Sequence, residues 1–387
     1  MRLRNSRVLA ALCAFSGFLL VVVARGWNGL DQIPSDPGYD YIGERARTGF
    51  SVIEVRPYLY ADQSLIASFA SLLPLGTRGL FLTIASHVIW AFCALTVFYF
   101  LRRLAFGLVE SFIGGLLLVS TPWAAQSVIG NYGNIRWPIL VAATVVISAE
   151  VATRQPRAMP LAIAAVAATL SNPLHPLLLA PLLIGMVFIS SGRRRALSFG
   201  AMPLIIGLVI NVLNVGAGGH DEKIRSFWAG AGLFWVSGQV LPTVIALTGL
   251  VLSLRNIRAA SERQLFAMHV FVLAVLLAVA SYQLGGIADR YYVAPAALAA
   301  IGALVWLTDF RSRSAKLGKI IAVALAVVLT VPTTRWFFIF PYLRSAEGWS
   351  TQVAKVREQC STGDISSFEL VTSSGQSKTD PISCDDL

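Results

Sequence analysis

The chain has 387 residues, of which 56% are hydrophobic and 13% are charged, and its mean hydropathy is +0.69. This composition excludes the soluble globular class, whose surface needs far more charge. The net charge of +11 lies largely in short clusters between apolar runs, as the positive-inside rule produces. We therefore predict a polytopic α-helical membrane protein and do not expect nucleic acid as a partner.

The first 25 residues have the outline of a signal peptide, with Arg2, Arg4 and Arg7 followed by an apolar run. That run is as long as a full membrane span, and no small-residue cleavage motif follows it. We therefore expect an uncleaved first helix over residues 8–23, with the N-terminus in the cytoplasm.

About 11 apolar segments predict transmembrane helices. A further segment, residues 61–75, is too short to span and has apolar residues at helical spacing, which favours a helix in the membrane interface. The fifth and sixth segments are interrupted by Pro173 and Pro176, so we expect a broken pair of short helices inside the bundle. The expected spans are residues 8–23, 80–101, 106–120, 138–151, 159–170, a segment ending near 190, 199–215, 234–254, 265–282, 293–307 and 320–340.

The charges predict the orientation. With the N-terminus inside and the C-terminus outside, seventeen of the 31 Lys and Arg residues fall on the cytoplasmic side, in short basic connections. Only four of the 20 acidic residues do, namely Glu110, Glu150, Glu262 and Asp309. We expect a transmembrane domain over residues 1–342, which includes a first extracytoplasmic loop at 26–75, and a small extracytoplasmic tail at 343–387.

Cys360 and Cys384 lie in that polar tail. If the tail is exported, we expect them to form a disulfide, because oxidising compartments favour pairing.

The first extracytoplasmic loop carries six of the 20 acidic residues of the chain. Asp36 and Asp40 lie four residues apart, so both point the same way if the segment is helical. Either carboxylate could act as a general base on a substrate hydroxyl, and Asp36 is the favoured candidate. The alternative is that Asp36 caps a helix, because Pro37 follows it at a first-turn position.

Five residues outside that acidic pair are candidates for binding substrate. Arg56 and Arg136 could hold a phosphate through bidentate hydrogen bonds or extend to the membrane interface. Asp289 and Arg290 form a local ion pair or line a substrate groove. His175, between two prolines, is either a buried structural histidine or part of the site.

We assign no residues as metal ligands. His220, Asp221 and Glu222 have suitable side chains but adjacent positions, so their side chains diverge. A divalent cation stays open as a cofactor. The chain has no Walker A or dinucleotide-binding motif, so a cytoplasmic nucleotide-sugar donor is not expected.

Four stretches are informative when taken together, namely PYLYADQSLIASFASLLPL, GNYGNIRWPIL, SNPLHPLLLAPLL and ADRYYVAPAALA. They resemble the GT-C superfamily of integral-membrane glycosyltransferases, and more narrowly a group of uncharacterised bacterial members. The resemblance implies inverting transfer of a sugar from a polyprenyl-phosphate donor to an envelope glycan or lipid on the outer face of a bacterial inner membrane. It also implies a catalytic carboxylate in the first external loop, here Asp36 or Asp40. The adjacent acidic pair typical of the superfamily is absent from this loop.

Two other functions are compatible with the sequence. The chain could be a transporter or flippase for a lipid-linked or envelope substrate. It could also be a non-catalytic membrane assembly subunit.

Overall fold

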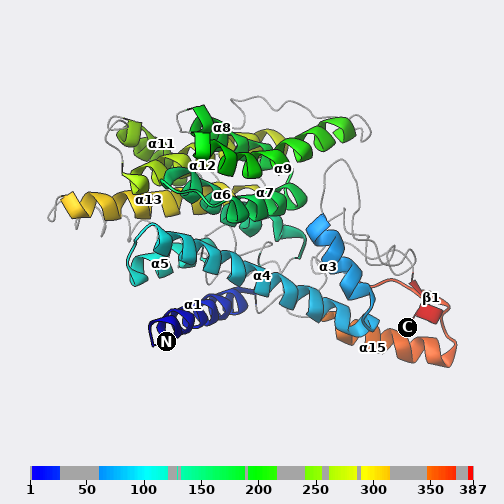
Figure 1. Ribbon diagram of the computed structural model, residues 1–387. Helices are drawn as coiled ribbons and strands as arrows, with labels where there is room; N and C mark the ends of the chain where they lie inside the picture. The colour runs from blue at the N-terminus through cyan, green and yellow to red at the C-terminus, as the bar shows by residue number, and fades with distance from the viewer. Residues whose placement is uncertain are drawn as a thin grey trace.

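The described residues of the computed structural model are 2–26, 61–120, 129, 132–187, 191–215, 240–254, 261–285, 289–313, 347–371 and 382–386. Within them the fold is all-α apart from one short antiparallel strand pair (Figure 1). The α-helices are α1 (Arg2–Gly26), α3 (Ala61–Ser71), α4 (Leu75–Arg103), α5 (Leu108–Val119), α6 (Arg136–Ala152), α7 (Ala158–Ser171), α8 (Leu179–Val187), α9 (Ser191–Val215), α11 (Val240–Leu254), α12 (Glu262–Gly285), α13 (Val293–Arg313) and α15 (Trp349–Thr362). The short elements are the 3-10 turns η3 (Tyr132–Asn134), η4 (His175–Leu178), η6 (Asp289–Tyr292) and η7 (Cys384–Asp386), and the strands β1 (Ser367–Phe368) and β2 (Ile382–Ser383).

Four of the described helices are long and apolar enough to cross a membrane. Every expected span up to residue 307 overlaps a helix, but several of these helices are shorter than a span requires. The expected span at 320–340 lies outside the described residues. The structure thus confirms an all-α protein with apolar helices of membrane-spanning length, located at Val8–Gly26, Leu75–Arg103, Arg194–Leu213 and Glu262–Ser281.

The expected interface helix ends earlier than predicted, at Ser71 instead of residue 75. Pro74 explains the break, because proline lacks a backbone donor and disfavours helix at the residue before it. Arg78 of α4 folds back over this end and donates to the carbonyls of Leu73, at 3.0 Å, and Ser71, at 3.1 Å. The turn from α3 into α4 is therefore closed by a side chain of α4 itself.

Small residues allow α1, α4 and α5 to pack closely. A Cβ added to Gly115 of α5 would meet the Phe18 ring of α1 and would lie 2.7 Å from the Ala94 carbonyl oxygen of α4. Phe18 is fully buried and its ring stacks on that of Phe112, with centroids 5.0 Å apart. Glycine at such a crossing is typical of membrane helices, which associate through close backbone approach.

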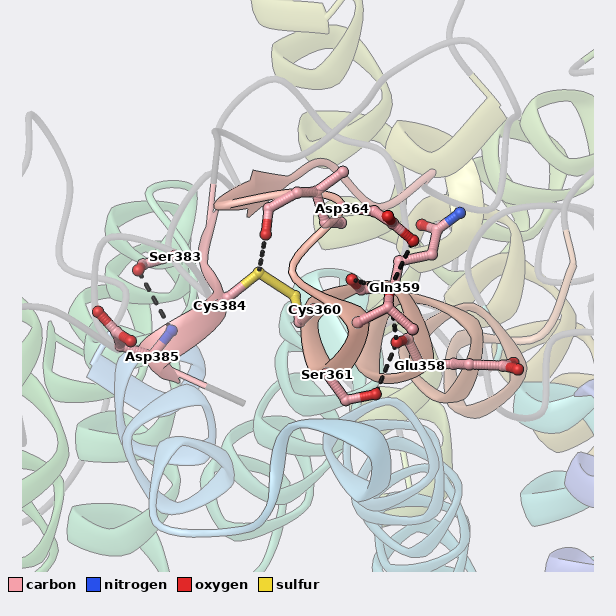
Figure 2. Close-up of a disulfide and its surroundings, with 10 residues drawn as sticks. Glu358, Gln359, Cys360, Ser361, Asp364, Ser383, Cys384 and Asp385 are labelled. Atoms are coloured by element: carbon pink, nitrogen blue, oxygen red, sulfur yellow. Dashed lines mark hydrogen bonds between the residues drawn. A yellow bond between two sulfur atoms is a disulfide. The ribbon is translucent and has the colours of Figure 1, made fainter.

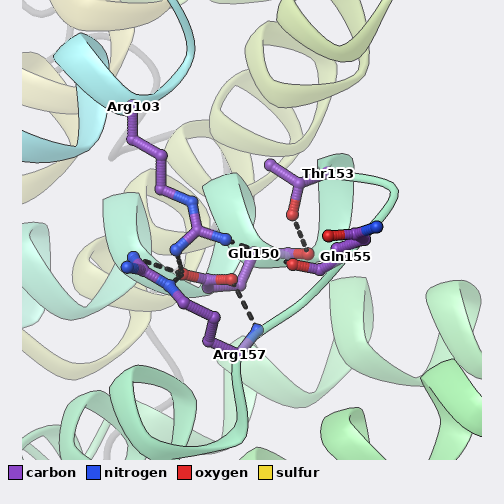
Figure 3. A network of polar contacts seen from close by, with 5 residues as sticks. All are labelled: Arg103, Glu150, Thr153, Gln155 and Arg157. Atoms are coloured by element: carbon purple, nitrogen blue, oxygen red, sulfur yellow. Dashed lines mark hydrogen bonds and ion pairs between the residues drawn. The ribbon is translucent and has the colours of Figure 1, made fainter.

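The C-terminal end of α6 carries a buried carboxylate, Glu150, between two arginines (Figure 3). Its Oε1 lies 2.7 Å from Arg103 Nη1 of α4 and 3.0 Å from Arg157 Nη2. Its Oε2 accepts a hydrogen bond of 2.8 Å from the Arg157 backbone N–H, at the start of α7. One carboxylate therefore joins the ends of α4, α6 and α7.

The same end of the bundle includes α12 and α13. Glu262 accepts from the Arg154 backbone N–H at 2.9 Å, and Arg263 donates to the Leu104 carbonyl at 3.0 Å. Gln264 donates to Asp309 Oδ2 at 2.8 Å.

Three of the four acids predicted to be cytoplasmic thus lie at one end, although the side of the membrane stays a prediction. We call this the charged end; its members are Arg103, Glu150, Arg157, Glu262, Arg263 and Asp309.

A second hydrophobic cluster lies at the opposite end of α4, where the C-terminal residues form a small folded unit. We call residues 347–371 and 382–386 the C-terminal cap. It comprises α15, β1, β2 and η7, and it packs on the first turns of α4 beside α3 (Figure 1). The predicted Cys360–Cys384 disulfide is present and joins the end of α15 to the residue after β2 (Figure 2).

Replacing Glu150 with glutamine should destabilise the protein by about 2 kcal/mol, because it leaves the partly buried Arg103 without a counter-charge. The thermal unfolding midpoint of the full chain in detergent measures this loss. Glu347 is the matched control, because its pair with Lys355 is exposed, with side chains 43% and 64% accessible. Glu347→Gln should change stability by less than about 0.5 kcal/mol. Equal shifts of the unfolding midpoint in the two variants would mean that the buried Glu150 carboxylate stabilises the protein no more than an exposed one does.

Gly115→Ala should cost about 1–3 kcal/mol, since the added methyl group has to displace α1 or α4. Gly200→Ala in α9 is the control: its Cβ would meet Leu161 Cβ at 3.4 Å, an ordinary contact. The two variants are compared by the fraction of each protein that stays monodisperse after heating. Comparable heat resistance would show that the α1, α4 and α5 crossing is looser than described.

Candidate functional site

The end of the bundle opposite the charged end contains described residues from all four stretches that carry the resemblance. Helix α6 shows the separation: Arg136 starts the helix and Glu150 lies 14 residues on, which corresponds to about 21 Å of helix. At the Arg136 end, η3 lies directly before α6, η4 contacts α6 and α12, η6 contacts α12 and α13, and α3 contacts η3 and α7. Segments far apart in the sequence therefore meet here.

Arg136 lies at this end beside aromatic side chains. It is 9% exposed, and its guanidinium carbon lies 5.1 Å from the centre of the Trp137 ring. Tyr291 of η6 meets the same ring edge-on, with centroids 5.4 Å apart. A cation held over an indole face is favoured, most strongly where water is excluded. The result is a positioned, largely buried guanidinium next to two aromatic rings.

The break between α7 and α8 supplies the second part of the site. Asn172 is fully buried and uses several of its polar groups. Its Oδ1 accepts from the Leu174 N–H at 2.9 Å, its carbonyl accepts from His175 Nδ1 at 2.8 Å, and its Nδ2 donates weakly to the Arg136 carbonyl at 3.5 Å. Asn172 thereby connects the broken helix pair to the first turn of α6.

His175 is also fully buried and faces α9. A Cβ on Gly207 would lie 2.7 Å from His175 Nε2, so the imidazole occupies space that only glycine leaves free. Thr169 adds a hydrogen bond of 3.3 Å to the Pro203 carbonyl. The predicted break in the helix is confirmed, and it is packed inside the bundle against α9.

The first stretch reaches the site through Gln63 of α3. The Gln63 side chain is 6% exposed and donates a hydrogen bond of 2.7 Å to the Gly133 carbonyl in η3. Gly133 lies three residues before Arg136. We call the whole set the polar cluster; its members are Gln63, Arg136, Trp137, Asn172, His175 and Tyr291.

The predicted site residues divide into three groups. Asn172 links the backbone of Arg136 to His175, because its side chain donates to the Arg136 carbonyl and its own carbonyl accepts from the His175 ring. Asp289 and Arg290 form the first half of η6, directly before Tyr291, but their side chains lie outside the described residues. The candidate bases Asp36 and Asp40 and the arginine Arg56 also lie outside them.

Sequence reasoning missed Gln63, Trp137, Asn172 and Tyr291 as members of the cluster. A signal was present for Asn172, because an asparagine after an apolar helix and before a proline commonly hydrogen-bonds to the backbone of the following turn. Gln63 carried no comparable signal, since its partner is a backbone carbonyl 70 residues away.

Among the described residues, no group of three or more His, Cys, Asp or Glu side chains could hold a metal ion. The divalent cation that the sequence left open stays a prediction. What the polar cluster offers is hydrogen-bond donors and a fixed positive charge, which suit an anionic group such as a phosphate.

Comparisons of the chain with protein-family models, with curated proteins and with solved structures find no match.

Asn172→Ala should lower stability by about 1–3 kcal/mol, because it leaves the buried Leu174 N–H without an acceptor. Thermal unfolding in detergent measures the effect. Thr96→Ala serves as control, since the Thr96 hydroxyl is exposed and bonds only within its own helix, to the Phe92 carbonyl; it should change stability by less than about 0.5 kcal/mol. An Asn172→Ala protein as stable as the Thr96→Ala protein would mean that the break does not depend on this side chain.

Proposed function

We propose that the chain is a membrane glycosyltransferase that transfers a sugar from a polyprenyl-phosphate donor to a cell-envelope glycan or lipid. One observation carries the proposal: the described parts of the four stretches that resemble the GT-C superfamily lie apart in the sequence and come together at one end of the bundle. Such convergence is what a shared site requires.

In this proposal Arg136 binds the phosphate of the donor. Its guanidinium is shielded from water and oriented by Trp137, so it would act on the charge of the departing phosphate in a medium of low dielectric. Arg290 and Arg56 are further phosphate ligands, and Asp289 contacts the sugar or acceptor. The general base is a first-loop carboxylate, Asp36 or Asp40, which takes the proton of the acceptor hydroxyl.

The proposed donor and acceptor also indicate the membrane in which the protein lies and its orientation. Donor and acceptor are membrane-anchored or envelope molecules, so we propose a bacterial inner-membrane protein whose polar cluster faces outward and whose charged end faces the cytoplasm. The basic residues of the charged end support this orientation. So does the Cys360–Cys384 disulfide at the other end of α4, because disulfides persist in oxidising compartments.

The test combines complementation with an in vitro assay. A deletion strain receives Asp36→Asn, Asp40→Asn, Arg136→Gln or Arg136→Lys, and its envelope glycans are profiled; purified full-length protein is assayed for sugar release from polyprenyl-phosphate donors. One of the aspartate variants should lose about 100-fold or more in rate. Arg136→Gln should also lose about 100-fold, and Arg136→Lys should lose less, since the charge survives without the bidentate fork.

Lys355→Ala, on the exposed face of α15, is the control and should retain full transfer. Wild-type glycan profiles from all four site variants at normal expression would overturn the proposal.

One observation favours a transporter as a second candidate. The α7–η4–α8 segment is a broken helix with buried polar side chains, Asn172 and His175, a feature that transporters use at their substrate sites. Proteoliposomes separate the two functions. Movement of a polyprenyl-linked sugar between leaflets without transfer to acceptor, abolished by His175→Ala, would establish transport.

A further inference from the structure

The C-terminal cap is fixed to α4 by close and specific contacts. Trp349 is 1% exposed and donates a hydrogen bond of 2.7 Å from its indole Nε1 to the Leu75 carbonyl, in the first turn of α4. A Cβ on Gly79 would lie 3.1 Å from Trp349 Cβ, and one on Gly76 would lie 3.6 Å from Val353. The glycines of α4 therefore form the surface on which α15 rests.

Helix α3 belongs to the same hydrophobic cluster. Ala67 and Ala70 are buried in it together with Trp349, Val353 and the cap residue Phe368. With 11 residues, α3 is too short to be stable by itself, so its position depends on what packs against it. Those partners are α4, α7 and η3, together with the cap residues of this hydrophobic cluster.

The other side of α3 contacts the polar cluster through one buried hydrogen bond, from Gln63 to the Gly133 carbonyl. Gly133 belongs to η3, and α6 begins with Arg136 immediately after this turn. A continuous series of contacts thus runs from the disulfide through α15, the first turns of α4, α3 and Gln63 to η3, directly before α6.

We propose that the C-terminal cap positions the polar cluster by holding α3, and that Gln63 is the positioning residue that transmits this constraint to η3. The Cys360–Cys384 disulfide keeps the cap folded, because two strands of two residues each form only a marginal pair. Opening the disulfide therefore loosens η3 and the start of α6 from a distance, without any substitution in the polar cluster. The consequence for sugar transfer rests on the proposed function, whereas the coupling does not.

Hydrogen exchange on the full chain in detergent tests the coupling. The variants are Cys360→Ser with Cys384→Ser, Gln63→Ala, and Gln63→Glu, which keeps the shape but removes the donor. Each should raise amide exchange over residues 132–136 by about 10-fold, as expected for the loss of one stabilising contact. Combining Gln63→Ala with the cysteine variant should add little further, because both act on one series of contacts.

Two controls separate coupling from misfolding. Lys355→Ala should leave exchange unchanged throughout, and the charged end, over residues 150–157, should stay protected in every variant. The proposal is overturned if the cysteine variant raises exchange in the cap and α3 alone, if Gln63→Glu behaves as wild type, or if the two effects add fully.

The activity assay then distinguishes this proposal from the proposed function. If hydrogen exchange shows the coupling, the cysteine and Gln63 variants should also lose sugar transfer, mainly through a raised KM for the polyprenyl-phosphate donor. That result supports both the positioning role and the proposed function. If hydrogen exchange shows the coupling but neither the wild-type protein nor any variant transfers sugar, the proposed function is wrong and the positioning role stands.

Discussion

Helix ends carry backbone groups that lack partners within the helix, and lipid cannot satisfy them. In this chain side chains from neighbouring elements do so. Arg25 donates to the Val119 carbonyl at the end of α5, at 2.7 Å, and Glu150 accepts from the N–H before α7. The same contacts fix how the helices lie against one another, because each donor and its acceptor belong to different elements. Packing of apolar surface holds the bundle together, but these bonds determine its register.

The bundle consequently has two chemically different ends. At the charged end, Glu150 bridges Arg103 and Arg157 and Asp309 accepts from Gln264, contacts that join neighbouring helices. At the other end, amides, an imidazole, a guanidinium and aromatic rings meet with no described carboxylate among them. This asymmetry is the physical reason that the proposal places the phosphate at the Arg136 end.

Composition and apolar length predicted the helical membrane class, the broken helix at Pro173 and Pro176, and the cysteine pair, because each depends on local sequence. The predicted helix boundaries were less accurate. The turn that ends α3 is closed by the Arg78 side chain, and no local sequence pattern predicts that contact. The polar cluster includes two candidates that charge and proline context mark in the sequence, Arg136 and His175, and their role in binding substrate stays a prediction. Gln63 and Tyr291 are not marked in this way, since their roles come from partners far along the chain.

The length of α4 has a consequence for the stability of the isolated membrane part. Its 29 residues extend about 43 Å, whereas the hydrocarbon core of a bilayer is about 30 Å thick. With Arg102 and Arg103 at one interface, roughly the first two turns stand clear of the lipid at the other. Those turns carry Leu75 and Leu82, which the cap and α3 bury. A chain shortened before Trp349 would therefore present an apolar, water-facing helix surface, and such surfaces promote self-association.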